Sequence, residues 1–206
     1  MRRYDGRMIA RRRLILAALG AVRLGGQAIE FESGGLRYLT LTRNGVTLMF
    51  AMLPVQIREY TVMQVALANG SQRSWQFKPD DFKYTRSDGT VLTGLRARDV
   101  VSNFMEHGGR DDVIKLVTTY ESGLYGMKGI KSTNGYEARR QNYMAIVDST
   151  KLKAAAAASA IVLAPVRLKA GESTDGAVFF INGGKPLGPG TLRVEAGGTI
   201  FTFDKP

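Results

Sequence analysis

The fold is decided by the stretch LRYLTLTRNGVTLMFAML, residues 36–53. Apolar and β-branched residues dominate its two halves, so the stretch predicts two β-strands, Leu36–Thr42 and Val46–Leu53. Between them, Asn44-Gly45 favours a hairpin turn, because both residue types adopt positive φ readily. The second run is apolar on both of its faces, which indicates a buried strand. We expect Pro54 to end this strand, since proline cannot donate to a central ladder.

Similar short runs recur along the chain and are separated by turn residues such as Ser87-Asp88-Gly89. Short strands with turns at roughly eight- to twelve-residue spacing are typical of a β-sandwich or barrel, not of a parallel α/β sheet. The further predicted strands are Tyr60–Ala68, Trp75–Lys78, Phe82–Arg86, Thr90–Leu95, Ile161–Lys169, Gly176–Asn182, Thr191–Ala196 and Thr199–Phe203.

The pattern changes to helical in the middle of the chain. Arg98–Glu106 has apolar residues at helical spacing, and Asp111–Ser122 reads as a second short helix or an irregular segment. The glycine-rich segment Ser122–Gly135 predicts a mobile loop. Tyr136–Ala160 lacks glycine and proline and contains five consecutive alanines, so we expect one long helix there. Alanine also permits close packing against another surface.

These segments together predict a mainly β protein with a helical insertion, in the α+β class. The insertion covers about residues 96–160 and separates two β halves that complete one sandwich. We expect a single domain over residues 29–206, with the helices covering an end or a face of the sandwich.

Several turns and strand starts resemble those of secreted immunoglobulin-like domains of bacteria. In these domains a strand ending in Asn-x-Ser is followed by Phe-x-Pro, and later by a Leu-x-Pro-Gly-Glu turn leading into a Gly-x-Val-x-Phe strand. The resemblance covers about 30 of the 206 residues, with Ala170 where proline is usual, and the helical insertion departs from it. It implies an immunoglobulin-like β-sandwich and no particular activity. The residues that carry it are Tyr60, Val62, Gln64, Ala66, Leu67, Asn69, Ser71, Phe77, Pro79, Leu168, Gly171, Glu172, Ser173, Gly176, Val178, Phe179 and Phe180.

The amino-terminal arm has the pattern of a signal peptide. Residues 1–23 carry seven arginines and one acid, so they contribute +6 of the net charge of +11. An uncharged apolar stretch, Leu14–Val22, and the small residues before Ala28 follow the basic start. This stretch is too short to span a bilayer as a helix. We expect cleavage near Ala28, which places the mature protein in the periplasm or outside the cell. The alternative is an uncleaved basic arm that binds a membrane surface or nucleic acid.

The composition excludes several kinds of chemistry. The chain has no cysteine and a single histidine, His107, which rules out disulfides, thiolate metal sites, a cysteine nucleophile and any two-histidine metal site. The acidic pairs Asp80-Asp81 and Asp111-Asp112 follow turn residues, where aspartate commonly acts as a cap or turn former. The sequence therefore predicts no catalytic residue, metal site or cofactor.

Two segments remain as candidate contact surfaces, the glycine-rich loop and the polar face of the helix after it. Their candidate partner-binding residues are Tyr125, Lys128, Lys131, Arg139, Arg140 and Tyr143.

Three hypotheses of function follow. The first is an exported, non-enzymatic binding or structural component of a bacterial cell envelope, which contacts a protein or an anionic envelope polymer. The second is an envelope enzyme that acts on glycans or peptides with carboxylates converging in a cleft. The third is an intracellular binder of nucleic acid or a membrane surface through the arginine-rich arm. The modest charge of the remaining chain, +5 without the arm, disfavours nucleic acid as its partner.

Overall fold

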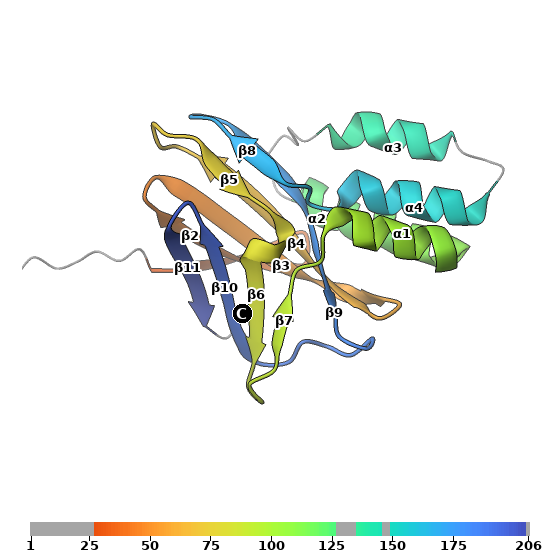
Figure 1. Ribbon diagram of the computed structural model, residues 1–206, viewed down its shortest axis with the longest axis horizontal. Helices are drawn as coiled ribbons and strands as arrows, with labels where there is room; N and C mark the ends of the chain where they lie inside the picture. The colour runs from red at the N-terminus through yellow and green to blue at the C-terminus, as the bar shows by residue number, and fades with distance from the viewer. Residues whose placement is uncertain (1–26, 127–134, 146–148, 205–206) are drawn as a thin grey trace, which may run out of the picture.

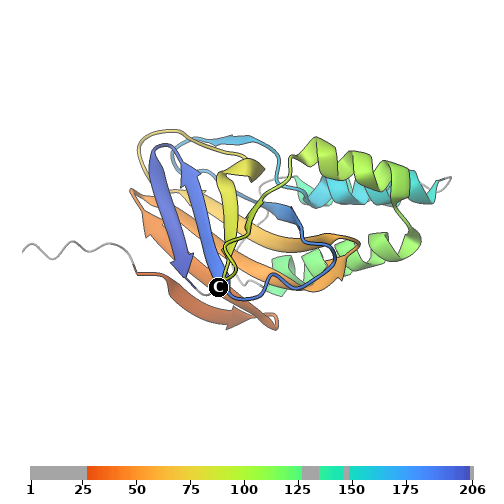
Figure 2. The same cartoon turned by 60° about the horizontal axis from the view of Figure 1, so that its bottom comes forward.

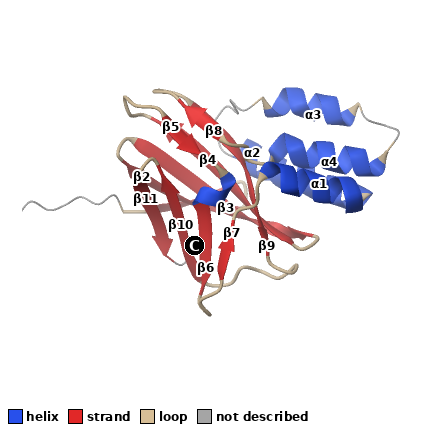
Figure 3. Cartoon of the chain, viewed as in Figure 1, coloured by secondary structure: helices blue, strands red, loops and turns tan. Residues whose placement is uncertain are grey.

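A computed structural model describes residues 27–126, 135–145 and 149–204. The described chain is mainly β, with antiparallel sheets and four α-helices, which confirms the α+β class. The four described helices follow one another between β7 and β8, where the sequence predicts the helical insertion (Figures 1 and 3). The strands before them are β1 (Ile29–Ser33), β2 (Leu36–Arg43), β3 (Val46–Ile57), β4 (Tyr60–Asn69), β5 (Trp75–Phe77), β6 (Phe82–Arg86) and β7 (Val91–Thr93). The helices are α1 (Ala97–His107), α2 (Arg110–Gly126), α3 (Tyr136–Met144) and α4 (Thr150–Ile161), and the last strands are β8 (Val166–Leu168), β9 (Ser173–Ile181), β10 (Gly190–Ala196) and β11 (Thr199–Asp204).

The strands form two larger sheets that draw on both β halves of the chain. The five-stranded sheet has the order β1-β2-β3-β4-β9, and the four-stranded sheet has the order β11-β10-β6-β7. Strands β5 and β8 form a small separate pair. Figure 2 shows the two larger sheets facing each other, with the helices gathered at one side of the five-stranded sheet. Neither large sheet is complete without strands from both sides of the helical insertion.

The central strands of the five-stranded sheet, β3 and β4, are buried on both of their faces. Alternate residues of β3 and β4, such as Phe50 and Val65, face the four-stranded sheet and join the aromatic residues Phe201 and Phe203 in one core. The residues between them, such as Ala51 and Val62, belong to a second core under the helices. Because successive side chains of a strand point to opposite faces, double burial requires a run that is apolar at nearly every position. This requirement explains the composition of Val46–Leu53.

The helices pack closely because small residues line their contacts. Ala154, Ala157 and Ala158 of α4 are fully buried against the other helices and the sheet. Gly108 ends α1 beside α4, and a β-carbon on this glycine would lie 2.5 Å from Cβ of Ala154. The alanine run is therefore a packing surface and not a linker.

The turn between β3 and β4 fastens the sheet to the helices. Arg58 takes a left-handed conformation there, with φ of 56°, and its Nη1 donates to the carbonyl oxygen of His107 at 2.8 Å. The same nitrogen lies 3.3 Å from Oδ2 of Asp112, which also accepts the backbone N–H of Gly109. One side chain thus holds the junction of α1 and α2 against the hairpin.

Several predicted boundaries were wrong. Strand β3 does not stop at Pro54 but continues to Ile57, with a register shift between Met52 and Gln56 at which the exposed proline needs no ladder partner. Tyr136–Ala160 is not one helix but contains α3 and α4, and residues 146–148 between them lie outside the described residues.

Three further boundaries also differ. Residues 122–126 of the predicted loop belong to α2. Ile161 ends α4, so only Val166–Leu168 of that predicted strand is extended. Strand β1 was not predicted, because its side chains are mostly exposed and carry no core pattern.

Candidate functional site

Helix α3 presents two adjacent arginines to two different cavities. Neighbouring helical residues point about 100° apart, and Arg139 and Arg140 accordingly extend in different directions. Arg139 lines a cavity beside the edge of the five-stranded sheet, here called the sheet-edge cavity. Arg140 lines a cavity among the helices, here called the helical groove.

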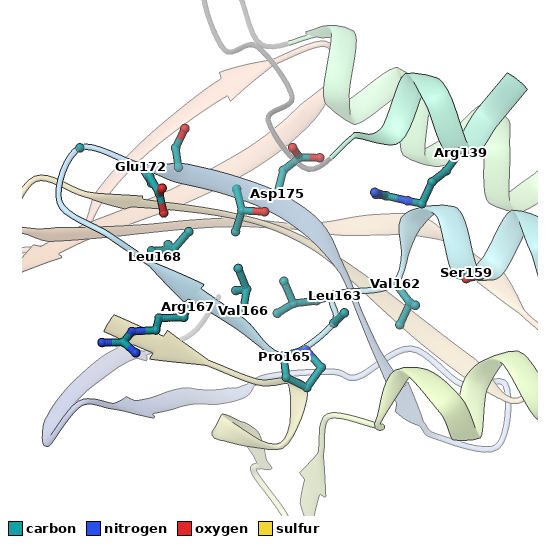
Figure 4. Close-up of a pocket in the computed structure, with 14 residues that line it drawn as sticks. Arg139, Ser159, Val162, Leu163, Pro165, Val166, Arg167, Leu168, Glu172 and Asp175 are labelled. Carbon is teal, nitrogen blue, oxygen red and sulfur yellow. The ribbon is translucent and has the colours of Figure 1, made fainter. Parts of the chain in front are cut away.

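The sheet-edge cavity has a volume of about 820 Å³ and lies between the end of α4, strand β8 and the start of β9 (Figure 4). Its apolar lining includes Leu163 and Val166, and its charged lining consists of Arg139, Arg167, Glu172 and Asp175. Two cations thus face two anions, so the lining is balanced in charge.

Three of these four charged groups form hydrogen bonds within the fold. The Arg139 guanidinium donates twice to the carbonyl oxygen of Ala160, at 3.1 and 2.9 Å, and so caps the end of α4. Asp175 is buried and accepts a 2.5 Å hydrogen bond from the Tyr120 hydroxyl. Glu172 accepts the backbone N–H of Lys169 at 2.7 Å. These side chains hold α4, α2 and the turn before β9 in place.

The two arginines should therefore differ in their effect on stability. We expect Arg139→Ala to lower the free energy of unfolding by about 1–2 kcal/mol, because two charge-assisted hydrogen bonds to a helix end are lost. Arg140→Ala should cost about 0–1 kcal/mol, as for a partly exposed ion pair. Urea unfolding followed by circular dichroism measures both values. Equal losses for the two variants would contradict this assignment.

The helical groove has a volume of about 630 Å³ and lies between α2, α3 and α4. Val113, Ile114 and Val117 of α2 and Met144 of α3 give it an apolar lining. Its charged lining consists of Arg110, Glu121, Arg140 and Lys153. Arg140 forms an ion pair with Glu121, so these two charges compensate each other. Arg110 and Lys153 leave the groove with a net positive charge.

Under α2, a buried tyrosine connects the helix to the sheet. The Tyr38 hydroxyl donates to the carbonyl oxygen of Gly123 at 2.9 Å and lies 3.2 Å from Oε1 of Gln64. A β-carbon on Gly123 would lie 1.9 Å from that Oε1, so a larger residue here would force the Gln64 side chain to move. Burial raises the pKa of Tyr38 to about 12.

This raised pKa predicts a loss of stability in alkali. A tyrosine of the unfolded chain ionises near pH 10, so the folded state holds its Tyr38 proton more tightly. The contribution is fully present below about pH 10 and is lost as the pH rises towards 12. We expect the urea midpoint of Tyr38→Phe to fall less steeply between about pH 10 and 12 than that of the unmodified protein. This difference in slope does not depend on how stable the variant is at pH 7. The same slope in both proteins would argue against the assignment.

The structure brings only part of the predicted site together. Arg139 and Arg140 lie on the same helix but line different cavities. Tyr125 belongs to the last turn of α2 and Tyr143 to α3, but their side chains lie outside the description. Lys128 and Lys131 lie outside the described residues.

Sequence reasoning missed Arg110, Ile114 and Lys153 of the helical groove. The signal was present in part, because the spacing of Val113, Leu116 and Val117 after Arg110 is helical. That spacing indicates the helix but not the neighbours that complete the groove.

The acidic pairs have the structural roles that the sequence predicts. Asp81 accepts the backbone N–H of Lys78 at 2.9 Å, and Asp112 accepts that of Gly109 at 2.8 Å. Within residues 27–126, 135–145 and 149–204, no three His, Cys, Asp or Glu side chains are grouped to hold a metal ion. None of the helices in these ranges is long and apolar enough to cross a membrane.

Comparisons with known proteins identify no family. No protein-family model and no curated protein sequence matches the chain. Among solved structures, the chain is similar to the yjhA protein from Bacillus subtilis, with a TM-score of 0.33 and 10% sequence identity over 81% of this chain and 77% of that chain. A likeness of this size supports no conclusion about fold or activity.

Proposed function

We propose that the protein is an exported, non-enzymatic binding component of a bacterial cell envelope, built on an immunoglobulin-like β-sandwich. A protein or an anionic envelope polymer is its partner, and the helical layer supplies the contact surface. The observation that carries this proposal is the helical groove. In it, the cations Arg110 and Lys153 stand beside the exposed apolar side chains of Ile114 and Met144. Exposed apolar surface next to charge is typical of an interaction site.

The position of the first strand supports export. The expected cleavage after Ala28 falls directly before β1, which begins at Ile29. Removal of residues 1–28 therefore leaves every strand of the described sheets intact. It also removes the arginine-rich arm, which carries more than half of the net charge.

The immunoglobulin-like character is supported by contacts between two distant parts of the resembling pattern. The backbone N–H of Asn69 donates to the carbonyl oxygen of Glu172 at 2.9 Å, and that of Gly171 donates to the carbonyl oxygen of Asn69 at 2.7 Å. The Asn69 side chain accepts from Ser71 and donates to the carbonyl oxygen of Leu168 at 3.1 Å. The strand–Asn-x-Ser segment and the Gly-Glu turn thus form one hydrogen-bonded corner, which gives the resemblance a structural reason.

The experiment that tests export is the intact mass of the protein recovered from its native cells, fraction by fraction. We expect a mass that begins near Ile29, in the periplasmic or extracellular fraction. A full-length mass in the cytoplasm would overturn the proposal and leave nucleic acid or the inner membrane surface as the first partner to test.

One observation favours the enzyme alternative, because Glu172 and Asp175 line the same sheet-edge cavity. Glycoside hydrolysis needs two carboxyl groups on either side of the bond. Both carboxylates already accept hydrogen bonds from the protein, which favours a structural role. Incubation with envelope glycans should therefore release no product. Release that disappears in both Glu172→Gln and Asp175→Asn would establish the enzyme instead.

A further inference from the structure

We propose that the helical groove binds a single-chain anionic amphiphile. Its phosphate or carboxylate head lies between Arg110 and Lys153, and its hydrocarbon chain lies over Ile114, Val117 and Met144. The inference rests on the proposed binding role of the helical layer and names the chemical class of its ligand.

The charges of the groove favour an anion. Arg140 is compensated by Glu121, with which it forms an ion pair. Across the described ranges, neither Arg110 nor Lys153 has an acidic side chain within ion-pair distance. Lys153 is half-buried, so part of its hydration is already lost before a ligand arrives. A ligand anion would supply an opposite charge that the described part of the chain does not place beside these two cations.

The amino-terminal end of α4 adds to the positive electrostatic potential of the groove. Ser149 and Thr150 line the groove, and Ser149 caps the helix by accepting the backbone N–H of Leu152. The amino terminus of a helix carries a partial positive charge from its unsatisfied N–H groups. It therefore reinforces Lys153, one turn further along the same helix, in attracting an anionic head.

The apolar lining favours a ligand that carries a hydrocarbon chain over an inorganic anion. Ile114 and Met144 are 52% and 50% exposed, although both are large apolar side chains. Together with Val113 and Val117 they make up the apolar part of the groove lining, which also contains the two cations. Free phosphate would leave this surface in water, whereas an attached hydrocarbon chain would cover it, and burial of apolar area is favourable.

The size of the groove decides between a small ligand and a macromolecule. Its volume of about 630 Å³ lies within the range of roughly 300–1,000 Å³ that is usual for small-molecule pockets. A stable protein interface instead needs about 800 Å² of surface on each partner. A concave groove of this size suits one acyl chain with its head group better than a protein surface.

The test is isothermal titration of the full chain with dodecyl phosphate below its micelle concentration. Two further titrations use inorganic phosphate, which has the head alone, and dodecyl maltoside, which has the chain without the charge. We expect dodecyl phosphate to bind at least tenfold more tightly than either. Equal binding of dodecyl phosphate and dodecyl maltoside, or of dodecyl phosphate and inorganic phosphate, would overturn the proposal.

Matched variants locate the site. Arg110→Ala/Lys153→Ala removes both groove cations, and we expect it to weaken the binding of dodecyl phosphate at least tenfold. Lys115→Ala/Lys151→Ala removes the same charge from the same two helices at exposed positions outside the groove lining, and should leave binding unchanged. Equal losses in the two double variants would show non-specific attraction and overturn the proposal.

One further variant and one further probe separate the remaining outcomes. Ile114→Ser replaces an exposed side chain, so it should fold normally and weaken dodecyl phosphate while leaving inorganic phosphate unaffected. Capture of an acidic peptide at the groove, without binding of dodecyl phosphate, would overturn the ligand class and leave the binding role standing. A cytoplasmic full-length protein that binds dodecyl phosphate would overturn export but not the groove ligand.

Discussion

Phe104→Ala should lower the free energy of unfolding by about 3–5 kcal/mol, the usual cost of removing a fully buried aromatic side chain. Phe104 of α1 is completely buried and packs against two aromatic rings of the five-stranded sheet. Its ring centroid lies 5.9 Å from that of Tyr60 and 6.5 Å from that of Phe179. The substitution leaves a cavity at the contact between the helices and the sheet.

Met105→Ala is the matched control for this prediction. Met105 is the next residue of the same helix, but it is 43% exposed. We expect it to change the free energy of unfolding by no more than about 0.5 kcal/mol. Urea unfolding followed by both tryptophan fluorescence and circular dichroism measures each variant. Similar losses for the two variants would show that Phe104 does not anchor the helices to the sheet.

Gly108→Ala should lower the free energy of unfolding by about 2–3 kcal/mol, because the added methyl group has no space. Its β-carbon would lie 2.4 Å from the carbonyl oxygen of Phe104 and 2.5 Å from Cβ of Ala154. Neither atom is the end of a flexible side chain, so the backbone of α1 or α4 has to move. Thermal unfolding should show a correspondingly lower midpoint.

Gly109→Ala provides the control for the glycine substitution. A β-carbon on Gly109 would meet only Oδ2 of Asp112, at an ordinary 3.5 Å. This variant should keep its stability within about 0.5 kcal/mol or gain slightly, because alanine restricts the unfolded chain. If Gly108→Ala were as mild as Gly109→Ala, the close packing of α1 on α4 would be refuted.

The sequence predicts the strands and hairpins well where local chemistry decides them. Asn44 and Gly45 take φ of 51° and 77°, as the hairpin requires, and Phe82–Arg86 is a strand with the predicted bounds. These features depend on residues that are neighbours in the chain. Helix α1 likewise follows the spacing of its apolar residues, and its bounds, Ala97–His107, lie within one residue of the predicted segment Arg98–Glu106.

The sequence did not predict features that depend on contacts between residues far apart in the chain. Strand β1 is held by its ladder with β2 and by stacking of Phe31 on Tyr38, not by a core pattern of its own. Strand β3 continues past Pro54 because β4 pairs again with Gln56 and Ile57 beyond the register shift. No local pattern contains this information, since the partner strand decides it.

In the candidate site, too, the sequence predicts the local features but not those that depend on distant contacts. Arg139 and Arg140 predicted the polar face of α3. The sequence did not predict that each arginine lines a separate cavity. The helical groove combines side chains of α2, α3 and α4, and its cation Lys153 directly precedes the five alanines of α4, which indicate only a packing role in the sequence. Convergence of three helices is a tertiary property, so spacing along the chain does not reveal it.

The pairing of strands across the helical insertion has a consequence for the order in which the protein matures. Tyr60 pairs with Ile181, and Phe82 pairs with Val194, so neither sheet can be completed before the strands that follow the helical insertion have been synthesised. Contacts between such distant segments make folding slow. A chain that has not yet acquired β9 presents the long apolar edge of β4 to other molecules, which is a route to aggregation. We therefore expect the nascent chain to be most prone to aggregation in the interval between the synthesis of β4 and that of β9.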